Sequence, residues 1–73
     1  MRAVPQAILF RKDTFTKSKA EKWLKDHNYT PIKKVHITND YLRYRLREPN
    51  SAVPMRIISL TKGIRMIVMI DPS

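Results

Sequence analysis

The sequence predicts a small α+β domain, with one helix packed on a mainly antiparallel sheet in the order β-α-β-β-β-β. Residues 13–28 have apolar side chains at helical spacing, whereas later segments alternate or run apolar over strand-sized lengths. Short turns join those later segments into hairpins. With 73 residues, the chain has room for one domain, and we expect a single basic domain over 1–73.

The first strand is expected at 6–12, "QAILFRK", a short apolar run that turns basic, with Pro5 marking its start. The helix follows in 13–28, where Ala20, Trp23, Leu24 and His27 share one face by i, i+3, i+4, i+7 spacing. Trp23 is therefore expected to be buried against the sheet. His27 is expected to pack or to cap the helix end rather than to bind a ligand.

The ends of the helix have their own signals. Thr16 can cap the first turn, because its hydroxyl accepts a backbone N–H that has no partner in the helix. Ser18 with Glu21 is a competing capping box, which leaves two alternative starts. Asn28 tolerates the left-handed conformation that ends helices. Lys22 and Lys25 are expected on the outward face of the helix.

Residues 32–38 and 41–47 are expected to form the first hairpin, with Asn39-Asp40 as a two-residue turn. This turn predicts the pairs Ile37–Leu42, His36–Arg43, Val35–Tyr44 and Lys34–Arg45. Val35 and Ile37 would then face the core. A proline-bounded loop covers 48–54.

Residues 55–60 and 64–70 are expected to form the second hairpin, with Gly63 supplying the positive φ of its turn. Alternate residues of the last strand from Ile64 to Ile70 would face the helix. Ile67 and Met69 would lie on the opposite side, which one helix cannot cover. We therefore predict a protein partner or a homo-oligomer through this C-terminal strand.

The chain carries 15 Lys and Arg against 6 Asp and Glu, a net charge of +9. So large an excess repels itself in the folded state, and an anionic partner is the commonest reason to keep it. Nucleic acid is the first expectation, and an acidic protein surface or a membrane surface is the second. Simple solubility is the alternative.

The same composition argues against enzyme chemistry. The chain has no cysteine and one glycine, which excludes thiolate chemistry and a Gly-rich phosphate loop. His27 and His36 are nine positions apart without further metal ligands nearby, and no serine has a nucleophile-elbow context. We predict no enzymatic activity, no cofactor and no metal. No apolar run reaches the roughly 20 residues of a membrane span, so an intracellular, soluble protein without membrane contact is expected.

A basic face is the candidate site. Arginines alternate with Leu42, Tyr44 and Leu46, so one side of the first hairpin would be cationic. Arginine's planar fork matches phosphate oxygens, and a neighbouring aromatic ring can stack on bases. The other interpretation is a solvated face that protects an edge strand. No base-readout motif is present, so binding to nucleic acid, DNA or RNA, should be largely independent of sequence. The predicted nucleic-acid-binding residues are Lys34, His36, Tyr41, Arg43, Arg45 and Arg47.

The stretches "FTKSKAEKWLKDHNY", "TNDYLRYRLREP" and "GIRMIVMI" resemble a short basic module in small proteins of large DNA viruses and tailed phages, where it accompanies structural and capsid-maturation proteins. The matching positions are Phe15, Thr16, Ala20, Trp23, Leu24, His27, Tyr29, Tyr41, Arg43, Tyr44, Arg45, Pro49, Gly63 and Ile64. The chain departs from the module at Met69-Ile70, where a glycine is expected.

The resemblance implies a virion-associated or DNA-associated small protein and carries over no catalytic residue. Together with the charge, it predicts non-enzymatic nucleic-acid binding by a basic sheet face, in a virus particle as one setting. The alternative function is a small structural or scaffolding protein of a viral particle or other assembly, docking on acidic protein surfaces.

Overall fold

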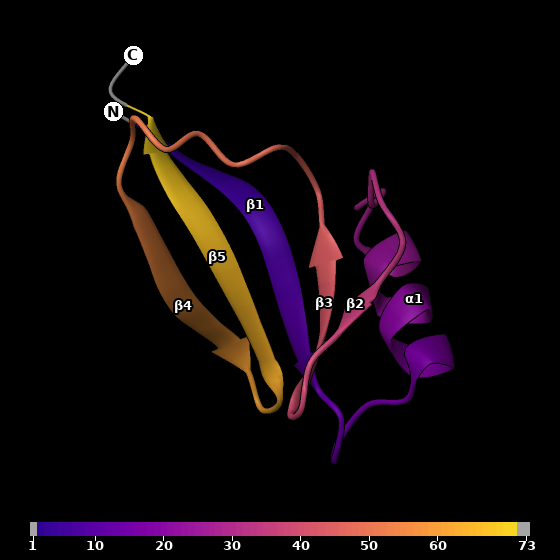
Figure 1. The fold of residues 1–73 in the computed structure, drawn as a ribbon. Coiled ribbons are helices and arrows are strands. Elements are labelled where there is room, and N and C mark those ends of the chain that lie inside the picture. The colour runs from indigo at the N-terminus through magenta and orange to yellow at the C-terminus, as the bar shows by residue number, and fades with distance from the viewer. Residues whose placement is uncertain (1, 72–73) are drawn as a thin grey trace.

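The computed structural model describes residues 2–71 and contains one helix and a five-stranded antiparallel sheet. The elements are β1 (Arg2–Arg11), α1 (Lys17–Asp26), β2 (His36–Ile37), β3 (Tyr41–Arg45), β4 (Met55–Thr61) and β5 (Ile64–Asp71), as Figure 1 shows. The predicted α+β class and the order β-α-β-β-β-β are confirmed.

The strands lie in the sheet in the order β2-β3-β1-β5-β4, and every neighbouring pair is antiparallel. The first strand is thus the central one, with the β2–β3 hairpin on one side and the β4–β5 hairpin on the other. This order brings residues from both ends of the sequence next to each other. It also leaves two edges, β2 and β4.

β1 is longer than predicted, and Pro5 lies inside it rather than at its start. The pairing with β5 shifts register between Pro5 and Ala7, which leaves Gln6 as an extra, fully buried residue. The ladder to β3 starts only at Ala7, so Pro5 has a strand partner on one side alone. That is where a sheet tolerates a residue without an N–H. The carbonyl of Gln6 accepts from the Leu46 N–H at 2.8 Å, and its Nε2 donates to the Arg47 carbonyl at 3.0 Å.

Helix α1 begins after Thr16, whose side chain accepts a hydrogen bond from the Lys19 N–H, as the capping signal predicts. It ends before Asn28, which has a φ of 62°. Ala20 and Leu24 are buried. Trp23 is half-buried rather than fully buried. Its ring packs edge-to-face with Phe10 at 5.6 Å between centroids and stacks on Tyr29 at 6.0 Å.

His27 lies at the helix end, in keeping with the interpretation from the sequence. Its ring stacks on Trp23 with 3.9 Å between centroids, and its Nδ1 lies 2.8 Å from the Trp23 carbonyl oxygen. The same carbonyl also accepts from the His27 N–H at 3.1 Å, so the ring is its second partner at the helix end.

The first hairpin has the predicted register, with His36 opposite Arg43 and Ile37 opposite Leu42. The Thr38 N–H donates to the Tyr41 carbonyl at 2.8 Å, which closes the turn over Asn39-Asp40. β2 is much shorter than predicted, and residues 34–35 precede it without regular pairing. Ile37 is on the same side of the sheet as its partner Leu42, as predicted, but its side chain is 57% exposed and does not join the core. It lies on the outer edge, where no further element covers it.

The second hairpin turns at Gly63, which has a φ of +82°. A side chain there would also come within 3.1 Å of Thr14. Ile64, Met66 and Val68 join the core, and Ile67 and Met69 alternate with them on the opposite side, as predicted. The expectation that this side is left uncovered is wrong for Met69, which is buried within the chain and whose sulfur accepts from the Asn50 N–H at 3.3 Å. Both edges of β5 are paired, one with β1 and one with β4. A contact of β5 with a second chain stays a prediction, and it would have to use a face of the strand.

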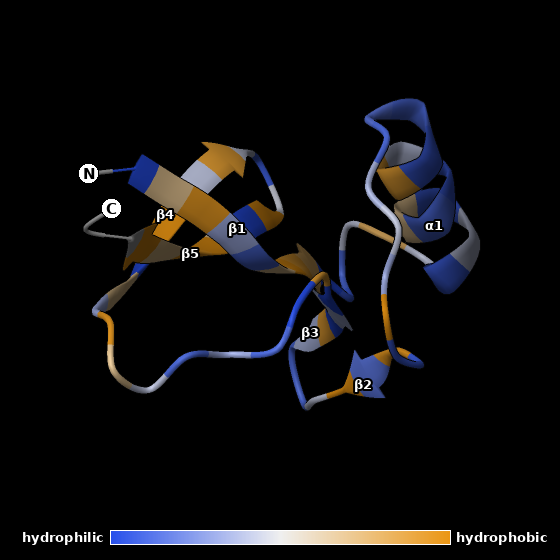
Figure 2. Ribbon diagram, turned by 90° about the horizontal axis from the view of Figure 1, so that it is seen from above, coloured by the Kyte–Doolittle hydropathy of each residue, from blue (hydrophilic) through white to orange (hydrophobic). Residues whose placement is uncertain are grey.

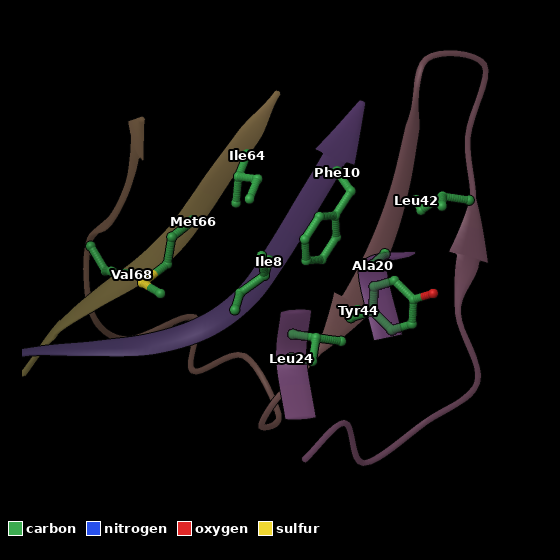
Figure 3. Close-up of a cluster of buried hydrophobic side chains, with 9 residues drawn as sticks. All are labelled: Ile8, Phe10, Ala20, Leu24, Leu42, Tyr44, Ile64, Met66 and Val68. Carbon is green, nitrogen blue, oxygen red and sulfur yellow. The ribbon is translucent and has the colours of Figure 1, made fainter. Parts of the chain in front are cut away.

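The core lies between α1 and one face of the sheet. Figure 3 shows its nine buried side chains, contributed by the helix and by the three inner strands: Ile8, Phe10, Ala20, Leu24, Leu42, Tyr44, Ile64, Met66 and Val68. Phe10 is at the centre and makes edge-to-face contacts with Phe15, Trp23 and Tyr44 at 5.1–5.7 Å. In Figures 1 and 2, α1 lies toward the β2–β3 end of the sheet, far from β4.

Among residues 2–71, no helix has the length and apolar character required to cross a bilayer.

Candidate nucleic-acid interface

The side of the sheet opposite the helix carries the candidate interface. In β3, Leu42 and Tyr44 are buried in the core, so Tyr41, Arg43 and Arg45 project to the other side. These three residues come from the predicted set, and they share one face as predicted. The strand is rigidly held because β1 and β2 pair with it on either side.

Two further predicted residues flank that row. His36 lies directly opposite Arg43 in β2. Lys34 precedes β2, and it lines a small hollow of about 300 Å³ together with His36 and Arg45. The structure therefore brings Lys34, His36, Arg43 and Arg45 together at the β2–β3 edge, although Lys34 is not part of a strand.

Arg47 lies apart from this group. It follows the end of β3, and its backbone bonds to Gln6 at the bulge of β1. Its side chain lines a different hollow, of about 130 Å³, beside Val4 and Met69. The chain leaves the sheet at this point, so the strand spacing that would align Arg47 with Arg45 no longer applies.

Two arginines that the sequence reasoning missed complete the surface. Arg11 of β1 and Arg65 of β5 alternate with the core residues Phe10 and Ile64, so both project away from the helix. The guanidinium carbon of Arg11 lies 5.8 Å from the centre of the Tyr41 ring, and that of Arg65 lies 6.0 Å from it. These are cation–π distances. We call Arg11, Tyr41, Arg43, Arg45 and Arg65 the arginine face.

A single row of cross-strand partners shows how the face is built. Leu9 of β1 pairs with Arg43 on one side and with Arg65 on the other. The apolar stem of each arginine can therefore cover a central leucine while the end of its guanidinium group points away from the sheet. The signal for Arg11 and Arg65 was the alternation within each strand, but the strand order was needed to place them beside Tyr41.

Carboxylates are almost missing from this surface. Arg11 pairs with Asp13, with 3.0 Å between Nη2 and Oδ2. That hydrogen bond is the main reason why the pKa of Arg11 is raised and the pKa of Asp13 is lowered. Within residues 2–71, no carboxylate comes within ion-pair distance of Arg43, Arg45 or Arg65. Their charges are thus open to an external anion.

Arg43 and Arg45 are held close to the sheet. Both residues are half-buried, and the Nε atom of each is covered and has no hydrogen-bond acceptor in the described part of the chain. The covered stems restrict the side chains, which reduces the entropy that binding must overcome. A rigid row of guanidinium groups favours contacts with a regularly spaced polyanion.

Among residues 2–71, no three histidine, aspartate or glutamate side chains come together as potential metal ligands. The absence of a metal, of a cofactor and of enzymatic activity stays a prediction.

Comparison of the chain with protein-family models, with curated proteins and with solved structures gives no match. The resemblance to a viral and phage module stays a prediction as well.

Proposed function

We propose that this protein binds nucleic acid without sequence preference, through phosphate contacts made by the arginine face. The observation that carries the proposal is the combination of Arg43, Arg45 and Arg65 on one rigid sheet face without carboxylate partners within residues 2–71. Like charges on neighbouring strands destabilise a sheet, and phosphates would offset them. Tyr41 adds a ring on which a base can stack.

The net charge of +9 supports the same function, because it lowers the free energy of association with any polyanion. Within residues 2–71, no helix can enter a major groove from this face, since α1 covers the opposite side of the sheet. Contacts to the backbone position a nucleic acid without reading its bases. A virus particle is one setting for such a protein, in line with the resemblance.

The test is the salt dependence of binding. Purified protein is titrated into labelled DNA and RNA of unrelated sequences over a range of salt concentrations. We expect similar affinities for all sequences and a linear loss of log affinity with log salt, with roughly one unit of slope per phosphate contact. Co-purification with nuclease-sensitive material would agree with this. No binding near physiological salt would remove the proposal and favour the second candidate.

The second candidate function is a structural component of an assembly, and the edge strand β4 favours it. All seven residues of β4 are exposed, and four of them are large and apolar: Met55, Ile57, Ile58 and Leu60. An exposed apolar edge strand presents unpaired N–H and C=O groups that can pair with another chain. The arginine face would then dock on acidic protein surfaces of the assembly.

A second copy of this chain is the partner that fits β4. Two molecules of charge +9 repel each other, and β4 carries one charged residue, Arg56. Antiparallel pairing of two β4 strands about Ile58, the middle residue, would separate the two Arg56 residues by about 14 Å along the sheet. That exceeds the screening length of about 8 Å in physiological salt, so repulsion there is weak.

Sedimentation equilibrium of two matched variants tests this candidate. Ile58→Lys places like charges opposite each other at the symmetry axis, so we expect a dimer of the unmodified chain to become monomeric. Ile37→Lys makes the same change at an exposed isoleucine on the other edge and should leave the dimer intact. An unmodified chain that stays monomeric at its highest soluble concentration would contradict pairing through β4.

A further inference from the structure

An open groove lies on the helix side of the molecule, away from the arginine face. It has a volume of about 880 Å³ and runs between α1 and the segment 28–35. The groove forms because the chain reverses at Asn28 and returns beside the helix without joining the sheet until His36. Leu24 and Tyr44 line it, and Tyr29 borders it. Its size is within the range of about 300–1,000 Å³ that is common for ligand sites.

The groove is strongly basic. Four lysines line it: Lys17, Lys25, Lys33 and Lys34. Lys25 is exposed, as predicted for the outward side of the helix, and it also borders the groove, because it follows Lys17 and Glu21 at spacings of eight and four residues.

Two carboxylates offset part of the positive charge of these lysines. Lys33 pairs with Glu48 at 3.0 Å. Glu21 is the acidic residue of the groove, and its Oε2 accepts a hydrogen bond from the Tyr44 hydroxyl at 3.3 Å. Within residues 2–71, Lys17, Lys25 and Lys34 have no ion-pair partner. The groove thus keeps a net positive charge.

The groove and the arginine face are connected. The hollow beside β2 is lined by Lys33, Lys34 and Val35, which also line the groove, and by His36 and Arg45. Because β2 is an edge strand, no further strand within residues 2–71 blocks the way around it. One continuous basic path therefore leads from one side of the sheet over its edge to the other side.

We infer that the nucleic acid bound by this protein is single-stranded and follows this path from the arginine face into the groove. The inference rests on the proposed function and adds the class of ligand. A duplex has a persistence length of about 50 nm and cannot turn over the edge of a small domain, whereas a single strand can. Tyr29 is half-buried at the groove, and one face of its ring stacks on Trp23 at 6.0 Å, so a base would stack on the other face.

The experiment compares the binding of an oligothymidylate and of a duplex of equal length. The groove variant is Lys17→Gln with Lys25→Gln, and the matched control is Lys19→Gln with Lys22→Gln, which removes two charges from α1 outside the groove. We expect the unmodified chain to prefer the single strand. The groove variant should lose affinity for it, and the salt slope should fall by about 1.4, because each single-strand phosphate contributes about 0.7.

The duplex should bind both variants alike, since it reaches only the arginine face. Equal affinity of the unmodified chain for both ligands, or equal losses from the groove variant and its control, would overturn the path and leave the arginine face as a site. If neither ligand binds, the proposed function fails together with the inference. Circular dichroism of both variants verifies that they are folded.

Discussion

The two halves of the sheet, β1 to β3 and β4 to β5, differ in how their edges are covered and in the side chains that they expose. The half formed by β1, β2 and β3 has α1 on one side and arginines on the other, and Phe10 at its centre is fully buried. The β4 edge of the other half has no helix beside it (Figures 1 and 2). It exposes four large apolar side chains and one charged residue, Arg56. The first half and β5 together supply the core and the arginine face, whereas β4 supplies an open edge.

The difference shows how one small domain can keep two kinds of surface apart. Arginines are tolerated where the strand beneath them is fixed by a packed core on its far side. Exposed isoleucines are tolerated on β4, where few core contacts depend on the strand. Charge near β4 would hinder pairing with another chain, and apolar groups among the arginines would hinder phosphate contacts. The following changes test this division.

Removing the centre of the core should have the largest effect. Phe10→Ala should cost about 3–5 kcal/mol, because a large buried ring is lost with its contacts to three other rings. Ile57→Ala, at a side chain that is 60% exposed, should change the free energy of unfolding by about 0.5 kcal/mol or less. Urea denaturation measures both. Similar losses from the two changes would mean that the halves are equally important for stability.

A charge on the arginine face should matter for binding, whereas a charge on β4 should not. Arg65→Gln removes a charge beside Tyr41, and the salt slope for nucleic-acid binding should fall by roughly one unit. Arg56→Gln removes the same charge from β4, where Arg56 faces Val68 on the helix side of the sheet. It should leave the slope nearly unchanged. A common reduction by both variants would show that binding depends on net charge alone.

The contact between helix and sheet should respond to alkaline pH. Burial, aided by Glu21, raises the pKa of Tyr44 to about 12, above its usual value of about 10. The folded state thus holds this proton more tightly than the unfolded state does. The resulting stability is complete below about pH 10 and is lost as the pH rises toward 12. In thermal melts over this range, Tyr44→Phe should lose less stability than the unmodified chain. Parallel losses would exclude Tyr44 as the source.

The smallest effect concerns Arg11, which is the one arginine of the face with a carboxylate partner in the described residues. Asp13→Asn frees its guanidinium and removes a negative charge at the rim of the face. Affinity for nucleic acid should therefore rise a few-fold, most clearly at low salt, where screening is weak. Fluorescence titration detects such a gain. An unchanged affinity would place Arg11 outside the region that the nucleic acid contacts.

Local features of the fold followed from local sequence. Thr16, Asn28 and Gly63 have the roles that their side chains or backbone freedom predict, because capping and turn geometry depend on nearby atoms. The register of the first hairpin followed from Asn39-Asp40 for the same reason. The alternation in β3 likewise placed Arg43 and Arg45 on one face.

The features that the sequence did not predict depend on which strands become neighbours, and long-range packing decides this. Nothing near Arg11 or Arg65 in the sequence indicates that β1 and β5 pair and bring both residues to Tyr41. The bulge at Gln6 and the short β2 are likewise set by tertiary contacts. The groove position of Lys25 was missed because the segment that closes the groove has no regular structure.

The central claim is that the arginine face is a site rather than a solvated surface. The most direct test is the binding of unrelated nucleic-acid sequences by Arg43→Glu with Arg45→Glu, compared with Lys19→Glu and Lys22→Glu on the helix. Both double variants change the net charge equally. We expect the strand variant to lose affinity for all sequences alike, with a shallower salt dependence, and the helix variant to retain most of its binding. Equal losses from the two variants would contradict the claim, because net charge alone would then explain the binding.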